Sequence, residues 1–349
     1  MPIGPQIASL QHQPHIVVGT PGRLLKLLKQ ESLKLEQCTG LVLDEADRML
    51  DMGFHDDIMA IIEAMPKQRQ TLLFSATYPA EIKRISRKVQ QDPTDIQVEA
   101  LHPDNKIEQI FYQVENQQRS ETTIALLRHF EPQSTLVFCN RKQQCREVCA
   151  DLRQAGFHAL ALHGDLEQKE RDQVLVQFAN HSSSVLIATD VAARGLDIKD
   201  LSAVINYELS PDPEIHIHRI GRTGRAEQSG LALSLFKPSE APKLVAIEKL
   251  QQHPVQQKDS ADLSPKSLYT LKPGMVTLCI QGGRKNKIRP GDILGALTAG
   301  KELDGKQIGK IDLFDIIAYV AVNRDCASQA LNILSNGKIK GRKYKVRKI

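Results

Sequence analysis

Short apolar runs that alternate with helical patterns restrict the fold of this chain more than any other feature. His15–Val18, Leu41–Leu43 and Thr71–Phe74 have the length and composition of buried strands. Gly22–Lys29 and Ile58–Met65, which lie between those runs, have the apolar spacing of helices. Strands that are apolar along their whole length are typical of parallel sheets, because crossover helices cover both faces. The pattern therefore predicts an α/β unit built on a parallel sheet.

The same pattern restarts after residue 105 and predicts a second α/β unit. Helices are expected between its strands, for example at Lys142–Ala155 and Gln168–Ala179. The polar stretch Glu99–Lys106 predicts a linker, so the first unit is assigned to residues 1–100 and the second to residues 105–245. The strands expected in the second unit are Gln109–Val114, Thr135–Cys139, Ala159–Leu162, Val185–Ala188 and Ala203–Asn206.

The C-terminal region has a different order of elements. The stretch Gln251–Ser267 is polar, rich in glutamine and contains two prolines, which indicates an extended linker, placed at residues 246–267. Residues 268–349 then have a β-α-β-β-α-β pattern, which predicts an antiparallel four-stranded sheet with two helices on one face. This α+β topology is that of RNA-recognition-type domains. Its expected elements are Met275–Ile280, Gly291–Ala299, Ile308–Leu313, Ile317–Val322, Ala327–Ser335 and Tyr344–Val346.

Basic residues are concentrated in the same C-terminal region. Residues 271–349 contain 16 lysines and arginines and 6 aspartates and glutamates, a net charge of +10. Residues 1–270 contain 30 and 35 respectively, a net charge of −5. This asymmetry favours a nucleic-acid contact surface, because lysine and arginine neutralise backbone phosphates. A basic face that is simply solvated is the alternative.

Several classes of protein are not supported by the sequence. No apolar run reaches the roughly 18 residues that a membrane span needs, and residues 1–15 lack the basic and apolar segments of a signal peptide. The six cysteines contain no C-x-x-C pair, so we expect free thiols in a reducing cytoplasm rather than disulfides or a zinc site.

Three carboxylates within four residues, Asp44-Glu45-Ala46-Asp47, follow the apolar run Leu41–Leu43. In open α/β sheets, ligands bind beyond the carboxyl ends of the strands. Adjacent acids at that position suit a magnesium ion together with an acid that polarises water. Taken alone, the four residues are also compatible with the acidic N-terminus of a helix.

Further polar segments follow predicted strands or begin predicted helices, where ligand-facing loops belong. Arg222 and Arg225 are three residues apart and can reach two phosphate oxygens from one side of a loop. Guanidinium suits this task because it forms bidentate hydrogen bonds and is always charged. The segments are Thr20–Leu24 (TPGRL), Ser75–Thr77 (SAT), Ala188–Asp197 (ATDVAARGLD) and His218–Arg225 (HRIGRTGR).

Together with the acidic run, these segments resemble the motifs of the DEAD-box family of RNA helicases. The five motifs occur in the family's order across residues 1–245. The resemblance implies two RecA-like domains that close on ATP and single-stranded RNA. Residues 1–100 correspond to an incomplete first domain, and residues 105–245 correspond to the second.

The resemblance implies a role for each matching residue in the first domain. Asp44 holds the magnesium ion of Mg-ATP, largely through water. Glu45 positions and activates the attacking water. Ser75 and Thr77 couple hydrolysis to domain closure, and Asp47 takes part in this coupling.

In the second domain the resemblance implies residues that face the nucleotide. Arg222 and Arg225 act as arginine fingers across the interdomain cleft. Gly195 and Asp197 meet the nucleotide, and His218 contributes to the coupling.

Other matching positions are those that grip the RNA backbone, which fits an enzyme whose core ignores base sequence. Two residues of this region have structural alternatives: His163 can simply cap a strand, and Arg171 can pair with Glu167 or Asp165. The positions implied to contact RNA are Thr20, Gly22, Arg23, Gly164, Arg171 and Thr189.

The C-terminal region, through Met275–Asp292 and Gly337–Ile349, resembles that of the DbpA subfamily of bacterial DEAD-box proteins. The resemblance implies an RRM-like domain that anchors the enzyme to a hairpin of large-subunit ribosomal RNA in the pre-ribosomal particle. Only Phe314, Tyr319 and Tyr344 are aromatic in or beside the expected strands, so basic loops are the expected contact, and a generic basic anchor is the alternative. The candidate contact residues are Arg284, Lys285, Lys287, Arg289, Lys338, Lys340, Arg342, Lys343 and Lys345.

A phosphate-binding loop of the form G-x-x-x-x-G-K-[S/T] supplies the lysine that reaches the β- and γ-phosphates, and this sequence contains no match to it. We therefore interpret the chain as N-terminally truncated relative to the family. The apolar faces of Leu41–Leu43 and Thr71–Phe74 are then expected to be partly uncovered. Two functional hypotheses remain open. One is an ATP-dependent RNA helicase that acts in the cytoplasm on large-subunit ribosomal RNA during ribosome assembly; the other is a catalytically inactive RNA-binding fragment.

Overall fold

The structure, a computed structural model, divides into two compact units, Met1–Leu101 and His102–Ile349. It describes residues 3–75, 78, 80–96, 107–115, 118–193, 201–224, 230–264 and 272–349. Within these residues no helix is long and apolar enough to cross a membrane. All six cysteines are free thiols, as the sequence predicts.

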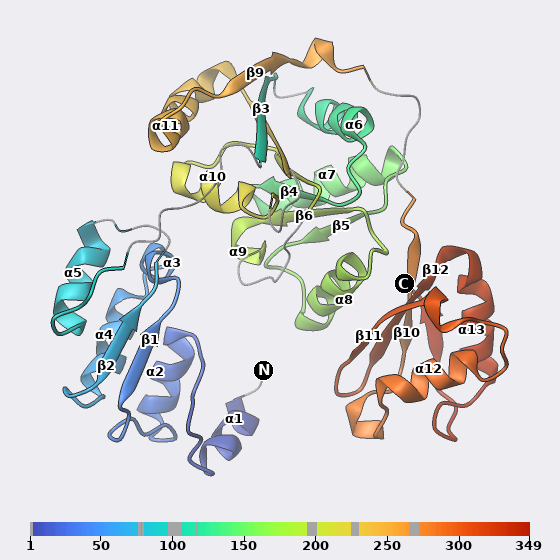
Figure 1. Cartoon of the computed structure of the whole chain (residues 1–349), viewed down its shortest axis with the longest axis horizontal. Coiled ribbons are helices and arrows are strands. Elements are labelled where there is room, and N and C mark those ends of the chain that lie inside the picture. The colour runs from blue at the N-terminus through green and yellow to red at the C-terminus, as the bar shows by residue number, and fades with distance from the viewer. Residues whose placement is uncertain are drawn as a thin grey trace. The chain divides into compact units, whose positions relative to one another are not determined.

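The first unit is a small parallel sheet flanked by helices. Strand β1 (Gly40–Leu43) pairs in parallel with β2 (Gln70–Leu73), with Gly40 opposite Gln70. Figure 1 shows the two strands side by side. Leu43 of β1 packs with the buried faces of two helices, for example with Ile58 and Ile82. The helices are α1 (Ile3–Leu10), α2 (Pro21–Lys29), α3 (Ala46–Asp51), α4 (His55–Glu63) and α5 (Ala80–Val89).

One apolar face of this sheet is uncovered in the described part of the chain. Val42 is 58% exposed, Leu72 41% and Phe74 54%. The partial exposure that the sequence predicts for these strands is therefore confirmed. The prediction of a buried strand at His15–Val18 is wrong: the segment forms no strand, and Ile16 is 81% exposed. An apolar run becomes a strand only where a neighbouring strand accepts its backbone hydrogen bonds, and no described strand lies beside this one.

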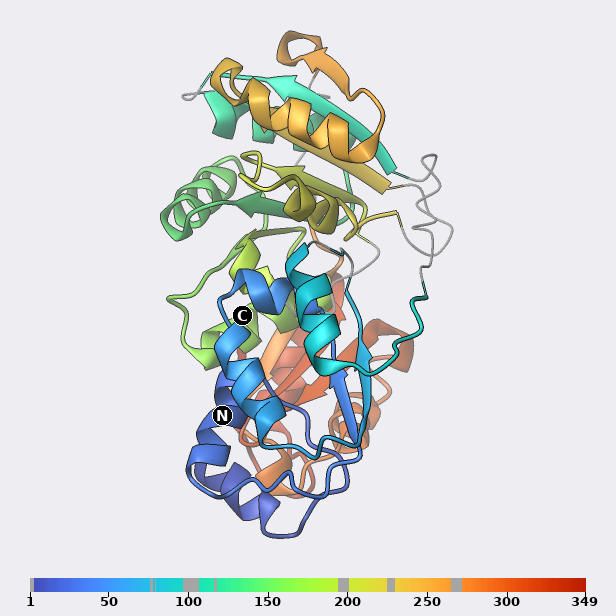
Figure 2. The same cartoon turned by 90° about the vertical axis from the view of Figure 1, so that its left-hand side faces the viewer.

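The second unit contains a seven-stranded parallel sheet in the order β5-β6-β4-β7-β8-β3-β9. Its interior strand β4 (Thr135–Cys139) is buried along its whole length. Helices cover both faces (Figure 2). The other strands are β3 (Ile107–Gln113), β5 (Ala159–Leu162), β6 (Val185–Thr189), β7 (Ala203–Asn206), β8 (Gly230–Phe236) and β9 (Gln256–Asp259). The helices are α6 (Arg119–Phe130), α7 (Lys142–Gln154), α8 (Gln168–Ala179), α9 (Asp190–Ala193), α10 (Pro213–Ile220) and α11 (Ala241–Gln251).

Alternate residues of β4 face opposite layers of helices. Val137 packs in the same core as Leu152 of α7 and Leu126 of α6. Phe138 packs in a second core with Phe178 of α8. Because both faces of the strand are buried, apolar residues are favoured at every position, which is why the composition alone predicts it.

The structure places a strand inside the segment that the sequence indicates to be an extended linker. Helix α11 continues to Gln251, and β9 follows and pairs in parallel with β3. All four residues of β9 are exposed. Its backbone hydrogen bonds, and not apolar side chains, hold it at the edge of the sheet, so no hydrophobic pattern indicated it.

The C-terminal domain has the predicted antiparallel four-stranded sheet, in the order β11-β12-β10-β13. Its core includes Leu278 and Val320 from the sheet, Ile293 from α12 and Ala330 from α13, so both helices lie on the same face. The last strand begins two residues later than predicted. The elements are β10 (Met275–Ile280), α12 (Pro290–Thr298), β11 (Ile308–Leu313), β12 (Ala318–Asn323), α13 (Ala327–Asn336) and β13 (Val346–Lys348). Short 3-10 helices span Pro238–Glu240, Ser260–Asp262, Arg284–Asn286, Gly305–Gln307 and Arg324–Cys326.

The two units are expected to differ in their ability to fold alone. An isolated 1–101 fragment has an exposed apolar sheet face, whereas a 102–264 fragment keeps all seven strands of the parallel sheet. We expect the first to give poorly dispersed amide NMR signals and the second to unfold cooperatively on heating. Well-dispersed signals and cooperative unfolding of the 1–101 fragment would contradict the expectation.

Candidate nucleotide and RNA site

The three acids that follow β1 lie at the start of α3. Glu45 precedes this helix with φ 52° and ψ 48°, a left-handed conformation that is uncommon for a residue with a side chain. Its backbone N–H donates to Oδ1 of Asp44 at 3.0 Å, and its carboxylate pairs with Arg48 at 2.8 Å. Asp47 lies in the first turn of α3, so the loop is also an acidic helix N-terminus. Strained backbone of this kind often occurs at functional sites.

A hydrogen bond joins the acidic loop to the segment after β2. The backbone N–H of Asp47 donates to Oγ of Ser75 at 3.2 Å, and Asp47 is buried. The backbone N–H of Ala46 donates to the carbonyl oxygen of Phe74. The structure thus brings together Asp47 and Ser75, two residues that the sequence assigns to coupling. Thr77 lies outside the described residues, and the coupling role stays a prediction.

The segment Thr20–Leu24 forms the N-terminus of α2. Thr20 is the N-cap residue, and its carbonyl oxygen accepts from the backbone N–H groups of Arg23 and Leu24. The guanidinium of Arg23 donates to Gln6 at 3.1 Å. A side chain at Gly22 would approach the carboxylate of Asp57, so the position is close to α4. A helix N-terminus is a favourable place for a phosphate.

In the second unit, two predicted RNA-binding residues meet at the short helix α9. Arg171 of α8 donates through its guanidinium to the carbonyl oxygen of Ala192 at 2.6 Å. The hydroxyl of Thr189, at the end of β6, accepts from the backbone N–H of Ala192 at 3.4 Å. Among the described residues, Asp165 pairs with Lys142 and Arg146, and Arg171 forms no ion pair with Asp165 or Glu167. Gly164 is exposed, with open space where a side chain would lie.

His163 belongs to a polar cluster at the end of β5. Its Nε2 lies 3.2 Å from Nε of Arg146, and Arg146 also pairs with Asp165 at 2.7 Å. Burial and the nearby Arg146 guanidinium lower the pKa of His163. Because a guanidinium can only donate, Nε2 of His163 accepts from Arg146, and this contact supports the loop that carries Gly164.

Arg219 is a buried centre of the second unit that the sequence analysis did not single out. Only 1% exposed, it pairs with both carboxylate oxygens of Asp190 at 2.7 Å. It also donates to the side chains of Asn140 and Asn206, at 2.8 and 3.3 Å, and to the carbonyl oxygen of Glu208. These partners lie at or just after the ends of β4, β6 and β7, so one guanidinium ties together three strand ends. The feature of the sequence that could have pointed to Arg219 is its position inside the motif HRIGRTGR.

The remaining residues that the sequence predicts to face the nucleotide are only partly described. His218 lies in the last turn of α10, and Arg222 follows that helix. The carbonyl oxygen of Arg222 accepts from the backbone N–H of Leu201. The hydroxyl of Thr223 donates to the carbonyl oxygen of Leu201. These bonds fix the backbone beside Arg222. Gly195, Asp197 and Arg225 lie outside the described residues.

The two basic segments of the C-terminal domain converge. The ammonium group of Lys340 donates to the carbonyl oxygen of Lys287 at 2.7 Å. Lys340 and Gly341 both have positive φ, and Ile339 and Arg342 bond to each other on either side, which forms a tight turn. The candidate residues Arg284, Lys285, Lys287, Arg289, Lys338, Lys340, Arg342, Lys343 and Lys345 therefore lie on two adjoining loops.

The aromatic residues of this domain are not displayed for base stacking. Tyr319 is 2% exposed and packs edge-on against Phe314, with ring centroids 5.6 Å apart. Burial raises the pKa of its hydroxyl to about 12. Tyr344 packs against the domain core. Basic loops are therefore better placed than rings to meet RNA.

Family models match three segments of the chain, and together they define a helicase with an added RNA-binding domain. The DEAD/DEAH box helicase family matches residues 1–85, and the helicase conserved C-terminal domain matches residues 118–227. The DbpA RNA binding domain matches residues 277–348. The predicted order of domain types along the chain agrees with these matches.

Individual relatives specify the family. The ATP-dependent RNA helicase DbpA of Escherichia coli K12 is 50% identical over 99% of this chain and 75% of its own length. The DbpA of Bacillus subtilis 168 is 34% identical, over 98% and 76%. The structure of S. cerevisiae Dbp5 bound to RNA and ADP BeF3 is similar with a TM-score of 0.64 and 31% identity, over 70% of this chain and 66% of that one. The chain belongs to the DEAD-box family of ATP-dependent RNA helicases and is a DbpA-like member.

Replacement of Arg219 by Gln is expected to destabilise the second unit by about 3–5 kcal/mol, because it leaves Asp190 without its buried partner. Urea unfolding followed by circular dichroism measures this change. The control is Arg146→Gln, which removes an exposed pair with Asp165 and should cost less than about 1 kcal/mol. Equal stability of the Arg219→Gln and Arg146→Gln variants would show that Arg219 does not hold the strand-end loops together.

Proposed function

We propose that this chain provides the Mg-ATP and RNA contacts of a helicase whose target is a hairpin of large-subunit ribosomal RNA. The observation that carries the proposal is the convergence of two basic loops on a domain that matches the DbpA RNA binding domain. Ribosome assembly, on a pre-ribosomal particle in the cytoplasm, is the proposed setting. The DbpA relatives of two bacteria, which are named ATP-dependent RNA helicases, support the helicase part of this proposal.

In the first unit, the proposed work of the acidic loop is to prepare the nucleotide for hydrolysis. Asp44 follows a parallel strand with an exposed carboxylate, which suits a magnesium ion held through water. Magnesium is commonly bound by one or two carboxylates together with substrate phosphates, so one acid suffices. Glu45 orients the attacking water. The hydrogen bond from Asp47 to Ser75 supports a role for this pair in coupling.

In the second unit, Arg222 and Arg225 are proposed to stabilise the charge on the transferred phosphoryl group, with His218 supporting them. Gly195 and Asp197 are proposed to meet the nucleotide. Arginine suits this work because its charge is permanent and its hydrogen bonds are bidentate.

RNA in the core is proposed to be held by its backbone. Arg171 and Thr189 meet at α9, and Thr20 lies at a helix N-terminus. Such contacts position an RNA strand without reading its bases. Gly22, Arg23 and Gly164 complete the proposed set.

A second candidate function is RNA binding without ATP hydrolysis. It applies to the 349 residues taken by themselves, which contain no G-x-x-x-x-G-K-[S/T] segment and so supply neither that lysine nor that backbone cradle for a triphosphate. The uncovered face of β1 and β2 is compatible with this reading.

We expect residues 272–349 to carry most of the RNA affinity. Lysine and arginine contacts release counterions, so log affinity should fall with log salt by roughly 0.7–0.9 per neutralised phosphate. The measurement compares hairpin binding by the full chain and by residues 1–264, which keep Leu263 packed on the core. Neutralising Lys338, Lys340 and Lys345 should weaken binding and lower the salt slope.

The matched control neutralises Lys301 and Lys306, which are exposed on the same domain outside the two basic loops. These changes should leave hairpin affinity nearly unchanged. Retention of full hairpin affinity by residues 1–264 would remove the anchor role from the C-terminal domain.

The 349-residue polypeptide is expected to hydrolyse ATP at no more than the background rate, with or without RNA. The physical reason is the missing phosphate cradle, and phosphate-release assays measure the rate. In a longer chain that carries the loop, Glu45→Gln should abolish hydrolysis and spare RNA binding. RNA-stimulated turnover by the 349-residue chain that disappears on Glu45→Gln would exclude the inactive alternative.

A further inference from the structure

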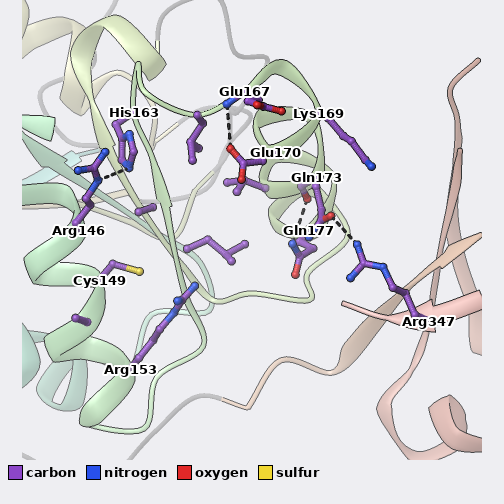
Figure 3. Close-up of a pocket in the computed structure, with 15 residues that line it drawn as sticks. Arg146, Cys149, Arg153, His163, Glu167, Lys169, Glu170, Gln173, Gln177 and Arg347 are labelled. Atoms are coloured by element: carbon purple, nitrogen blue, oxygen red, sulfur yellow. Dashed lines mark hydrogen bonds between the residues drawn. The ribbon is translucent and has the colours of Figure 1, made fainter. Parts of the chain in front are cut away.

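A basic cavity lies beside the edge strand β5, next to the polar cluster of His163 and Arg146. It has a volume of about 660 Å³ and lies between α7 and α8, with Arg347 of β13 at its border. Figure 3 shows Arg153 extending from α7 toward the space between the helices, and Arg347 extending toward Gln173 of α8. Lys169 contributes a third cation from α8. The cavity thus receives positive charge from three separate elements.

The hydrogen-bond partners of these cations are neutral groups. Arg153 donates through Nε to the carbonyl oxygen of Ala159 at 2.8 Å, and Arg347 donates to Gln173 at 3.3 Å. Within the described residues, Arg153, Lys169 and Arg347 form no salt bridge with an acid. By contrast, Arg146 at the same cavity is already paired with Asp165.

Two acids, Glu167 and Glu170, lie in a cavity wall that also contains four arginines and lysines, so the wall keeps a net positive charge. Glu170 accepts from the backbone N–H of Glu167, so it serves the N-terminal cap of α8. Lys169 and Arg347 act on the same buried group, the thiol of Cys279, where both oppose the rise in its pKa that burial causes. Two cations that reach one group from different elements repel each other, and an anion between them would relieve this repulsion.

The cavity also adjoins the surface assigned to the hairpin. Arg347 lies in β13, which follows directly on the basic segment Lys338–Lys345. Thr277 of β10 shares a 2.6 Å hydrogen bond with Ser182, just after α8, so the two sheets of the second unit meet here. An RNA that binds the basic loops can therefore continue toward the cavity. A chain of phosphodiesters suits a cavity of this size, lined by cations on several elements, better than a single small anion.

We propose that Arg153, Lys169 and Arg347 bind consecutive backbone phosphates of the RNA strand that extends from the hairpin. The inference rests on the proposed function, since it takes the C-terminal domain to hold that hairpin. Contacts to phosphate carry no base preference, so the site adds affinity for the flanking strand and sets its direction. Exposed side chains of this kind lose little in folding stability when they are neutralised.

The test compares two RNAs: a hairpin alone and the same hairpin with single-stranded extensions at both ends. The full chain is measured by fluorescence anisotropy over a range of salt, as wild type and as the Arg153→Gln/Lys169→Gln variant. We expect the variant to bind the extended RNA about tenfold more weakly, with a salt slope lower by roughly 0.7 per lost phosphate contact. Binding of the bare hairpin should stay within twofold of wild type.

The matched control is Lys249→Gln/Lys258→Gln, which removes the same charge from exposed residues at the opposite edge of the parallel sheet. It should leave both RNAs unaffected. Thermal unfolding confirms that each variant is folded. Arg347→Gln provides a second variant, which removes the contribution of β13, and it should also weaken the extended RNA selectively.

Equal binding of the extended RNA by the cavity variant and by the control would overturn the proposal. An equal loss for both RNAs would also overturn it, because the effect would then be one of general charge. The proposed function fails separately, when residues 1–264 bind the bare hairpin as tightly as the full chain. In that case a selective loss with the cavity variant would still establish a phosphate site beside β5.

Discussion

Burial of the central parallel strands on both faces is the constraint on which the second unit depends. Every residue of Thr135–Cys139 is buried, so helices must cover each side of the sheet. Parallel strands joined by crossover helices all end at the same edge. The segments after β4, β6 and β7 are therefore brought together even though they are far apart in the sequence. The topology of the sheet therefore places these segments at one edge, whichever residues they contain.

Arg219 fixes the relative positions of the segments at this common edge. A lone guanidinium that is 99% buried would be costly, but here Asp190, two asparagines and a carbonyl oxygen satisfy it. Asp190 begins α9, where Arg171 and Thr189 also make their contacts. The positions assigned to RNA and those that follow α10 are thus connected through one buried side chain, which gives a physical route between them.

In the C-terminal domain, a few close backbone and side-chain contacts hold the two basic loops in place. Gly283 has no side chain, because a Cβ there would collide with the backbone oxygen of Phe314. That approach lets the backbone N–H of Arg284 bond to Phe314 and that of Lys285 bond to Asp315, which holds the first basic loop against the sheet. Lys340 then ties the second loop to the first. Loops that are held in place in this way lose less conformational entropy when their lysines and arginines bind RNA.

The sequence by itself determined the parallel strands, the order of the three regions, the basic C-terminal surface and the family. Apolar runs such as Thr135–Cys139 and contiguous motifs such as HRIGRTGR are local, so they can be read without coordinates. Only the tertiary structure decided that His15–Val18 is not a strand, that Gln256–Asp259 is one, and that Arg219 is a buried centre. Those outcomes depend on which backbone groups and charges meet across the chain, and no local pattern records such meetings because the partners are distant in sequence.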